Sequence, residues 1–338
     1  MHSVTYALGL GALAFLALTW PLAGQSRGED PWIVFEGKDG PGKGKHIVFV
    51  TGDDEYRSEE LMPQLAKILA VHHGFKCTVL FPISRETGEI DPGTCDNIPG
   101  LEALKTADLM IIFCRFRELP DEQMKYIVDY MNTGKPMMGL RTATHSFNYT
   151  KHKDSPYAKY SFNSPDPKGG FGRLVLGETW INHYGAHQQE STRGLVAEGM
   201  QDSPIAKGCE DIWGPSDVYA ITTLPGDSKP VVMGQCLTGM DPKDPPNAAK
   251  KPVPVAWIKT FTGSEGKAAR VFTTTMGHGG DLVSEGVRRL LANAAYWCMG
   301  MEDKIPARAK VDFVGQYKPT PIGFGKHQKG MKPSDHKI

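Results

Sequence analysis

The sequence predicts an α/β fold in which a mostly parallel β-sheet carries helices on both of its faces. In the first half of the chain, short apolar runs alternate with amphipathic helical segments, the order expected of β–α–β units. Each run is apolar throughout, which is typical of strands that are buried on both faces. The chain has 338 residues, of which 40% are hydrophobic and 22% charged, an ordinary globular composition.

The elements of the first half follow one another with short connections. Ser58 is placed to cap the first helix, and Gly74 is placed to end it. Pro120 opens the second helix, and Gly134 ends it. The predicted strands cover residues 46–50, 76–81, 109–113 and 136–140.

The second half is less regular. From Asn148 to about Gly214 the periodicity is poor, and a stretch of this length without clear elements is typical of functional loops. A final helix is expected after Ser284, with an apolar face that runs to Trp297. Further strands are predicted over residues 218–221, 231–236, 254–259 and 269–275.

A sharp strand-to-helix turn is expected over residues 139–145. Some α/β enzymes hold their nucleophile at this position, over the carboxyl ends of the strands. Here the position holds Arg141, which cannot act as a nucleophile and does not lose its proton at ordinary pH. The sequence therefore excludes acyl transfer by a nucleophile at the position of Arg141.

Four polar clusters follow predicted strands or lie in the irregular stretch, and we expect them to meet at one rim of the sheet. They are residues 53–55, 141–145, 178–187 and 277–278. Acids, arginine and histidines that converge at strand ends are the pattern of a polar small-molecule site. The residues predicted to bind substrate are Asp53, Asp54, His145, Trp180, His183, Tyr184, His187 and Gly277.

His278 and Arg141 are the predicted catalytic residues. Glycines on both sides of His278 allow the backbone to approach a ligand closely, and an imidazole there is suited to general acid–base chemistry. The fixed cation of Arg141 is suited to holding a carbonyl, carboxylate or phosphate oxygen.

The histidines also allow a metal site, which stays open as an alternative. His183 and His187 have the i, i+4 spacing of paired ligands, but Gly185 argues against a helix there. Together with His145 or His278 they form a histidine-rich set. The leading prediction assigns neither a metal nor a cofactor.

The two ends of the chain differ from its centre. Residues 1–24 contain an apolar run over residues 7–18 followed by small residues, which indicates a cleaved export signal, with an uncleaved membrane anchor as the alternative. Residues 25–44 are a linker, residues 45–302 form the main domain, and residues 303–338 form an extended basic tail with eight Lys/Arg and three Asp/Glu. We therefore expect a periplasmic or extracellular protein without stable membrane insertion after cleavage.

Charge and cysteines restrict the function further. The formal net charge is zero, and no clustered basic face indicates nucleic-acid binding. Six cysteines remain after the predicted signal, without a CxxC pair. Several of them lie in strand or helix patterns, so we expect buried free thiols rather than disulfides or a zinc site of that type.

Taken together, these motifs resemble the ThuA-like (trehalose utilisation) family. The resemblance covers most of the chain after the signal, and the strand–Gly–His–helix order of its last motif is the most specific mark. The residues that carry it are 52–55, 139–145, 203–208, 216–219 and 270–278, followed by the helix to Trp297.

This resemblance implies a class I glutamine amidotransferase-like fold, related to flavodoxin-like sheets, without the amidotransferase cysteine. It also implies a role in bacterial carbohydrate metabolism, with disaccharides or their keto forms as substrates. Many relatives carry histidine where Arg141 stands, so an acid–base role does not transfer to this turn.

The predicted function is therefore an exported enzyme that binds and processes a sugar, of isomerase or lyase/hydrolase type and not a glutamine amidotransferase. Two alternatives remain. One is a non-catalytic carbohydrate-binding or assembly module on the same scaffold, and the other is a metal-dependent hydrolase.

Overall fold

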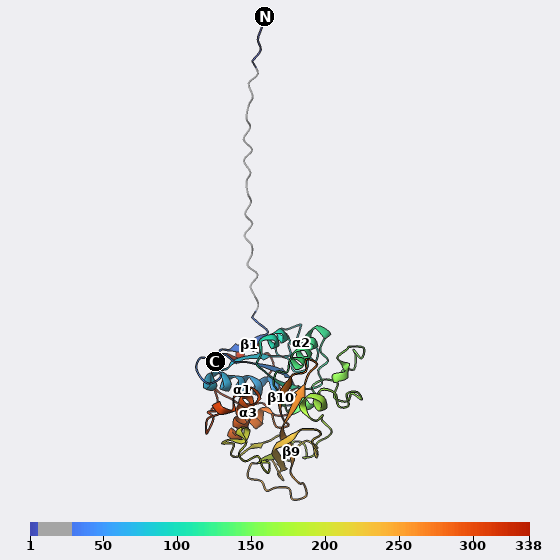
Figure 1. Ribbon diagram of the computed structural model, residues 1–338, viewed down its shortest axis with the longest axis vertical. Helices are drawn as coiled ribbons and strands as arrows, with labels where there is room; N and C mark the ends of the chain where they lie inside the picture. The colour runs from blue at the N-terminus through green and yellow to red at the C-terminus, as the bar shows by residue number, and fades with distance from the viewer. Residues whose placement is uncertain (6–28) are drawn as a thin grey trace.

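The computed structural model describes residues 1–5 and 29–338 (Figure 1). Most of the predicted export signal or anchor lies outside the described residues. Among the residues that are described, no helix is long and apolar enough to cross a membrane.

In the described part of the chain, ten strands form one sheet in the order β1-β3-β2-β4-β5-β10-β9-β8-β6-β7. The first half of the sheet is parallel, since β2 pairs in parallel with β3 and β4, and β5 pairs in parallel with β4 and β10. The strands of this half are β2 (His46–Gly52), β3 (Lys76–Leu80), β4 (Leu109–Cys114), β5 (Met137–Leu140) and β10 (Ala268–Thr274). This half agrees with the parallel sheet predicted from the apolar runs.

The second half is antiparallel, which corrects the prediction of a mostly parallel sheet. Strand β9 pairs antiparallel with both β10 and β8, and β6 pairs antiparallel with both β8 and β7. The strands of this half are β6 (Thr192–Val196), β7 (Trp213–Gly214), β8 (Lys229–Cys236) and β9 (Val253–Thr262). Another antiparallel strand, β1 (Trp32–Phe35), lies at the opposite edge beside β3, within the segment described above as a linker.

The predicted strand over residues 218–221 does not form. Tyr219 makes only an isolated bridge with His183, and β6 lies instead in the stretch that lacked periodicity. A run of apolar residues alone does not distinguish a strand from a buried loop, and Val218, Tyr219 and Ile221 are buried.

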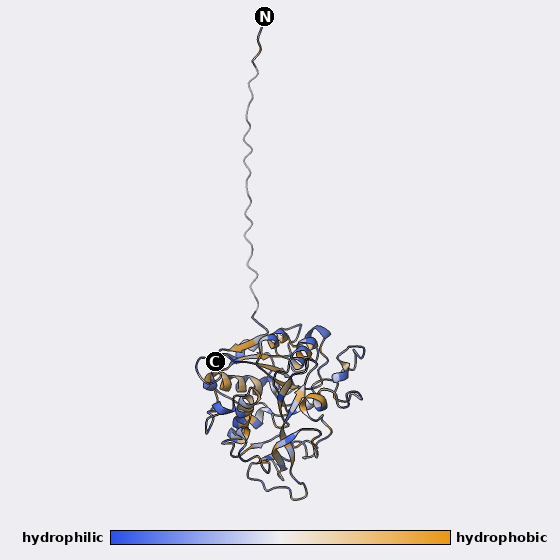
Figure 2. Ribbon diagram, viewed as in Figure 1, coloured by the Kyte–Doolittle hydropathy of each residue, from blue (hydrophilic) through white to orange (hydrophobic). Residues whose placement is uncertain are grey.

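Helices cover both faces of the parallel half. Helices α1 (Ser58–His73) and α3 (Glu285–Cys298) lie side by side on one face (Figure 1), and α2 (Asp121–Asn132) covers the other. In strand β2, Phe49 belongs to the first core and Val48 to the second, because successive side chains of a strand point to opposite faces. Hydropathy follows this arrangement, with hydrophobic residues along the strands and helices (Figure 2).

Short helical turns complete the fold. Among residues 29–338, seven are 3-10 helices and one, η4, is a π-helix. They are η1 (Leu101–Thr106), η2 (Arg141–His145), η3 (Ala158–Tyr160), η4 (Gly172–Leu176), η5 (Pro204–Ala206), η6 (Gly279–Val283), η7 (Glu302–Lys304) and η8 (Pro333–His336).

The tail after residue 302 is largely irregular but packs on the domain. Helix α3 holds it through Arg288 and Arg289, which donate hydrogen bonds to the carbonyl oxygens of Val311 and Ala309. Farther along, Tyr317 donates to the carbonyl oxygen of Gly279, at 2.8 Å. The tail therefore reaches the strand-end rim.

All six cysteines lie in the described part of the chain and are free thiols, as predicted. Cys77, Cys114, Cys236 and Cys298 are buried, and burial raises the pKa of each thiol. A thiol with a raised pKa is a weak nucleophile, so these four side chains act as small apolar groups.

Candidate functional site

The predicted strand-to-helix turn is present at the end of β5. Arg141 adopts a left-handed backbone conformation with φ of 47°, which costs a non-glycine residue roughly 1 kcal/mol or more. Gly277 lies against this turn, and a Cβ atom there would be 3.3 Å from the Cβ of Arg141, at a φ of 153°. The two predicted motifs therefore meet at the rim of the sheet.

Arg141 is fully buried between two aromatic rings. Its guanidinium carbon lies 4.3 Å from the ring centroid of Tyr56 and 4.0 Å from that of Tyr219. Its Nη1 donates to the backbone oxygens of Asp217 and Thr275, at 2.6 and 2.7 Å, and its Nη2 donates to Asp217 Oδ1 at 2.9 Å. Both terminal nitrogens thus donate within the protein, and Arg141 positions Asp217. Its Nε has no hydrogen-bond partner among the described residues, but the side chain is fully buried and does not face a substrate.

Asp217 is the buried centre of the site. Besides Arg141, it contacts two imidazoles: His183 Nδ1 lies 2.6 Å from Oδ2, and His187 Nδ1 lies 2.9 Å from Oδ1. Burial opposes ionisation, but the charge of Arg141 and the hydrogen bonds from His183 and His187 hold the pKa of this carboxyl well below its usual range. Asp217 is therefore a permanent carboxylate that fixes both rings.

The two imidazoles are the exposed part of this cluster. The side chain of His183 is 35% exposed and that of His187 is 27% exposed, whereas that of Asp217 is fully buried. His187 Nε2 lies 3.3 Å from Glu55 Oε1. Hydrogen bonding to Asp217 and Glu55 raises the pKa of His187 to about 9, so this ring is protonated at neutral pH.

The acidic turn after β2 divides into a structural and an exposed part. Asp53 is fully buried and accepts hydrogen bonds from Thr142 Oγ1, at 2.7 Å, and from the backbone nitrogens of Glu55 and Tyr56. Burial raises its pKa. Asp53 therefore ties this turn to η2, and its oxygens are not available to a sugar hydroxyl.

Arg115, directly after β4, binds the other two acids of the turn. Its Nη1 lies 3.1 Å from Asp54 Oδ1, and its Nε lies 3.5 Å from Glu55 Oε2. Burial disfavours the Glu55 carboxylate, but His187 and Arg115 lower its pKa below the usual value. A continuous chain of ion pairs thus runs from Asp54 to Asp217.

His278 has a structural role at the end of β10. Its Nδ1 accepts a hydrogen bond from Gly280 N, at 2.9 Å, and so caps η6. The residue is only 4% exposed, and burial lowers its pKa to about 4. Asp281 fixes the same loop by accepting from the backbone nitrogens of Gly277 and His278.

His145 is also buried. Its ring lies among Phe116, Trp180 and Tyr219, with centroid distances of 5.1, 5.4 and 6.0 Å. Burial lowers its pKa well below the ordinary value. The neutral, buried imidazole of His145 therefore packs against the neighbouring aromatic rings.

Trp180 is half-buried beside the exposed imidazoles, at a centroid distance of 5.9 Å from His183. The ring centroid of Tyr184 lies 5.9 Å from the ammonium nitrogen of Lys250. The structure thus brings His183, His187 and Trp180 together.

Sequence reasoning did not select several residues of this centre as site residues. They are Glu55, Tyr56, Arg115, Asp217 and Tyr219. Asp217 and Tyr219 lie in a motif that had been noted for its resemblance, which was the only signal for them. The partners of Asp217 come from residues distant in sequence, so its role depends on the tertiary fold.

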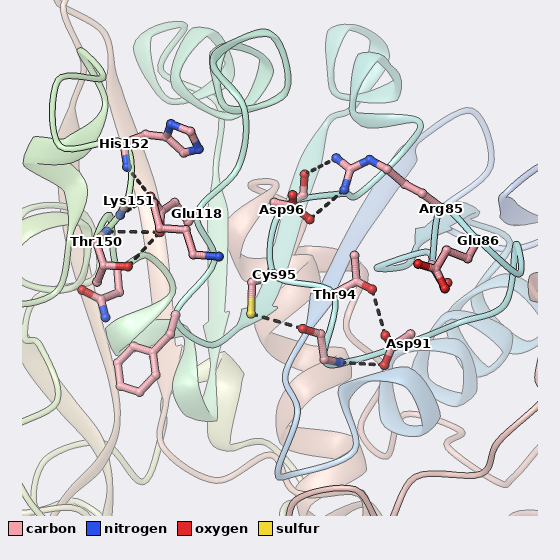
Figure 3. Close-up of a pocket in the computed structure, with 14 residues that line it drawn as sticks. Arg85, Glu86, Asp91, Thr94, Cys95, Asp96, Glu118, Thr150, Lys151 and His152 are labelled. Atoms are coloured by element: carbon pink, nitrogen blue, oxygen red, sulfur yellow. Dashed lines mark hydrogen bonds and ion pairs between the residues drawn. The ribbon is translucent and has the colours of Figure 1, made fainter.

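A separate cavity of about 730 Å³ lies beside this centre (Figure 3). Phe116 lines it and packs on His145, which connects the two regions. Glu118 lines it too, but its carboxylate accepts hydrogen bonds from the backbone nitrogens of residues 150–152 and so holds that loop. None of the residues predicted to bind substrate lines this cavity.

Sequence comparison identifies the family of this chain. Residues 46–298 match the ThuA (trehalose utilisation) family, a span that contains the whole centre. The chain belongs to the ThuA family. No curated protein matches the chain.

Two solved structures of ThuA-like proteins are similar to it. One, from Bacteroides uniformis ATCC 8492, is 17% identical with a TM-score of 0.44, and the match covers 77% of this chain and 93% of that chain. Another, from Parabacteroides merdae ATCC 43184, is 14% identical with a TM-score of 0.45, and the match covers 84% of this chain and 98% of that one.

In this ThuA-family chain the tail beyond the matched residues also contacts the site. Gly323 N donates to the carbonyl oxygen of Glu55, at 3.0 Å. The guanidinium carbon of Arg115 lies 5.0 Å from the ring centroid of Phe324, which is 60% exposed. The tail thus adds an exposed aromatic ring next to the acidic turn.

Proposed function

We propose that this chain is an exported protein of carbohydrate metabolism that binds a disaccharide or keto-sugar and processes it by acid–base chemistry at His183, His187 and Asp217. The observation that carries this proposal is the buried Asp217 carboxylate, which holds two partly exposed imidazoles. Family membership supports a sugar as the substrate class. The apolar run over residues 7–18 supports export.

His183 is the group we assign to proton transfer. Its Nδ1 lies 2.6 Å from Asp217, so the neutral ring holds its proton there and directs Nε2 away from the carboxylate. Asp217 both orients the ring and stabilises the imidazolium ion that forms when Nε2 takes a proton, the part that an aspartate has in hydrolase triads. His278 lacks this freedom because its Nδ1 caps η6 and its ring is buried.

Removal of a proton next to a sugar ketone also requires stabilisation of the negative charge that develops on oxygen. His187, which is protonated at neutral pH, and Arg115 supply positive charge around Glu55. Trp180 offers a half-buried ring beside His183 on which the apolar face of a pyranose can pack. The cluster therefore offers a base, nearby cations and a sugar-binding surface.

The proposal is tested by incubating the purified protein with a panel of disaccharides and 3-keto-disaccharides and following the products by mass spectrometry. We expect conversion of at least one keto-sugar, unchanged in the His152→Ala control, whose side chain is exposed outside the cluster. Saturable sugar binding without any product would instead indicate the non-catalytic binding module. The absence of both binding and product would refute the proposed function.

A further inference from the structure

The three residues at the centre of the site also have the arrangement of metal ligands. His183, His187 and Asp217 each offer one donor atom, and these atoms all lie within 4.8 Å of one another. We propose that the two Nδ1 atoms and a carboxylate oxygen of Asp217 bind one divalent transition-metal ion, with Zn²⁺ as the ion that suits this donor set best. Zn²⁺ is commonly bound by imidazole nitrogen and carboxylate oxygen together.

Only small movements separate the present geometry from ligation. The Nδ1 atoms of His183 and His187 lie 2.6 and 2.9 Å from the oxygens of Asp217. Zinc–ligand bonds of about 2.0–2.2 Å place tetrahedral donor atoms roughly 3.2–3.6 Å apart, so each imidazole has to move outward by less than about 1 Å. Both histidines are partly exposed and lie outside the strands and helices, where such movement is least restricted.

The donor set distinguishes between classes of cation. Two imidazoles and one carboxylate are the protein ligands of several catalytic zinc sites, in which water or substrate takes the remaining position. Mg²⁺ and Ca²⁺ prefer oxygen ligands alone, so they do not match two nitrogen donors. Partial exposure of both imidazoles leaves room for an exogenous ligand.

The residues around the donors have the arrangement found around bound metals. Glu55 Oε1 lies 3.3 Å from His187 Nε2, the nitrogen that does not ligate, and such an outer carboxylate orients a metal-bound imidazole. Arg141 fixes the Asp217 carboxylate from the buried side. Two of the three ligands are thus positioned before any metal binds.

The charges also favour a cation. Ligation requires neutral imidazoles, and in that state the carboxylates of Asp54, Glu55 and Asp217 face the two guanidinium groups of Arg115 and Arg141. The remaining single negative charge attracts a cation.

This inference concerns the same site as the proposed function. It rests on the proposed function only where it assigns the bound ion a part in catalysis. A bound Zn²⁺ acts as a Lewis acid on a carbonyl oxygen and lowers the pKa of its bound water. With the ion in place, the role assigned to His183 in proton transfer passes to that water, and Asp217 changes from a hydrogen-bond acceptor to a ligand. Ion binding itself requires no sugar.

The test is a binding measurement on the full protein after chelator treatment and dialysis. Titration with ZnCl₂, followed by elemental analysis, is expected to give about one ion per chain, and MgCl₂ is expected to give none. The double substitution His183→Ala with His187→Ala is expected to weaken Zn²⁺ binding at least tenfold, whereas His152→Ala leaves it unchanged. Circular dichroism checks that both variants are folded. CoCl₂ is expected to produce the visible absorption of a tetrahedral site in the wild-type protein and in His152→Ala, but not in the double variant.

The possible outcomes separate this inference from the proposed function. Zinc far below one ion per chain, or full binding by the double variant, overturns the metal site, whatever the sugar assays show. One bound ion that is lost in the double variant supports the site even if no sugar is converted, in which case the proposed function alone fails.

Discussion

The residues at the strand ends and the residues of the loop between η4 and β6 contribute to the same rim in different ways. Asp53, Arg141 and His278, which follow β2, β5 and β10, are buried and held by hydrogen bonds within the protein. His183 and His187, in the loop, keep about a third and a quarter of their side-chain surface exposed. The strand ends build the frame, and the loop supplies the groups that are able to meet a substrate.

Electrostatics separates the two regions in the same way. Burial lowers the pKa of His278 to about 4, whereas hydrogen bonds to two carboxylates raise the pKa of His187 to about 9. One imidazole is therefore neutral at pH 7 and the other charged. Substitutions and pH changes should affect the stability of the two regions differently.

The largest effect on stability is expected for Arg141→Ala. The substitution leaves the Asp217 carboxylate buried without its main counter-charge, and breaking a buried ion pair costs about 3–5 kcal/mol. Urea denaturation followed by tryptophan fluorescence measures this loss. Arg85→Ala, which removes an exposed pair with Asp96, serves as the control and should change the unfolding free energy by about 1 kcal/mol or less. A loss of under 1 kcal/mol in Arg141→Ala would contradict a framework role.

A smaller effect is expected from protonation of His278. The pKa of His278 is about 4 in the folded protein against 6.5 in the unfolded chain. Its contribution to the unfolding free energy is therefore fully present above pH 6.5 and is lost as the pH falls towards 4. The loss amounts to about 2–3 kcal/mol. Between pH 7 and pH 4.5, the His278→Asn variant should therefore lose less unfolding free energy than the wild-type protein, by about 2 kcal/mol. Equal losses in both proteins would show that His278 is not buried in its neutral form.

The loop should show the opposite dependence, with a smaller magnitude. The pKa of His187 is raised, so its stabilising contribution is complete below pH 6.5 and is lost as the pH rises through about 9. Because the ring is partly exposed, solvent screening reduces this contribution to about 1 kcal/mol. Unfolding measured between pH 7 and pH 10, with chelator present, should reveal it in the wild-type protein and not in His187→Gln. A wild-type profile that matches that of the variant would disprove the ion pairs of His187.

The strand-end frame was largely predictable from sequence because it follows local rules. The apolar run before Arg141 predicted the strand-to-helix turn, and β5 followed by a left-handed Arg141 and η2 confirms it. The predicted first helix matches α1 in extent and ends at a left-handed Gly74, but the predicted cap was wrong: the N-cap is Arg57, and the Ser58 hydroxyl accepts hydrogen bonds from Gly52 N and Asp53 N instead. Apolar runs report burial, however, and not the direction in which strands pair, so the antiparallel half around β9 was missed.

The centre itself was only partly predictable. The sequence indicated His183 and His187 because their spacing is that of paired metal ligands. The Asp217 carboxylate that binds both rings lies 34 and 30 residues farther along the chain. Arg141, which binds the Asp217 carboxylate, lies 76 residues before it in the sequence. The burial of His145 likewise results from the packing of Phe116, Trp180 and Tyr219 around its ring, for which the sequence has no periodic signal.

The smallest effect on stability and the largest on activity are expected for His183→Ala. Measuring turnover and unfolding free energy of this variant tests most directly the claim that the loop, and not the strand ends, carries the chemistry. With a converted keto-sugar as substrate, turnover should fall at least about tenfold, since general acid–base catalysis contributes about 10²–10⁴-fold. The unfolding free energy should change by about 1 kcal/mol or less, because only one partly exposed hydrogen bond is removed. Undiminished turnover in a folded His183→Ala protein would contradict the claim that the loop carries the chemistry.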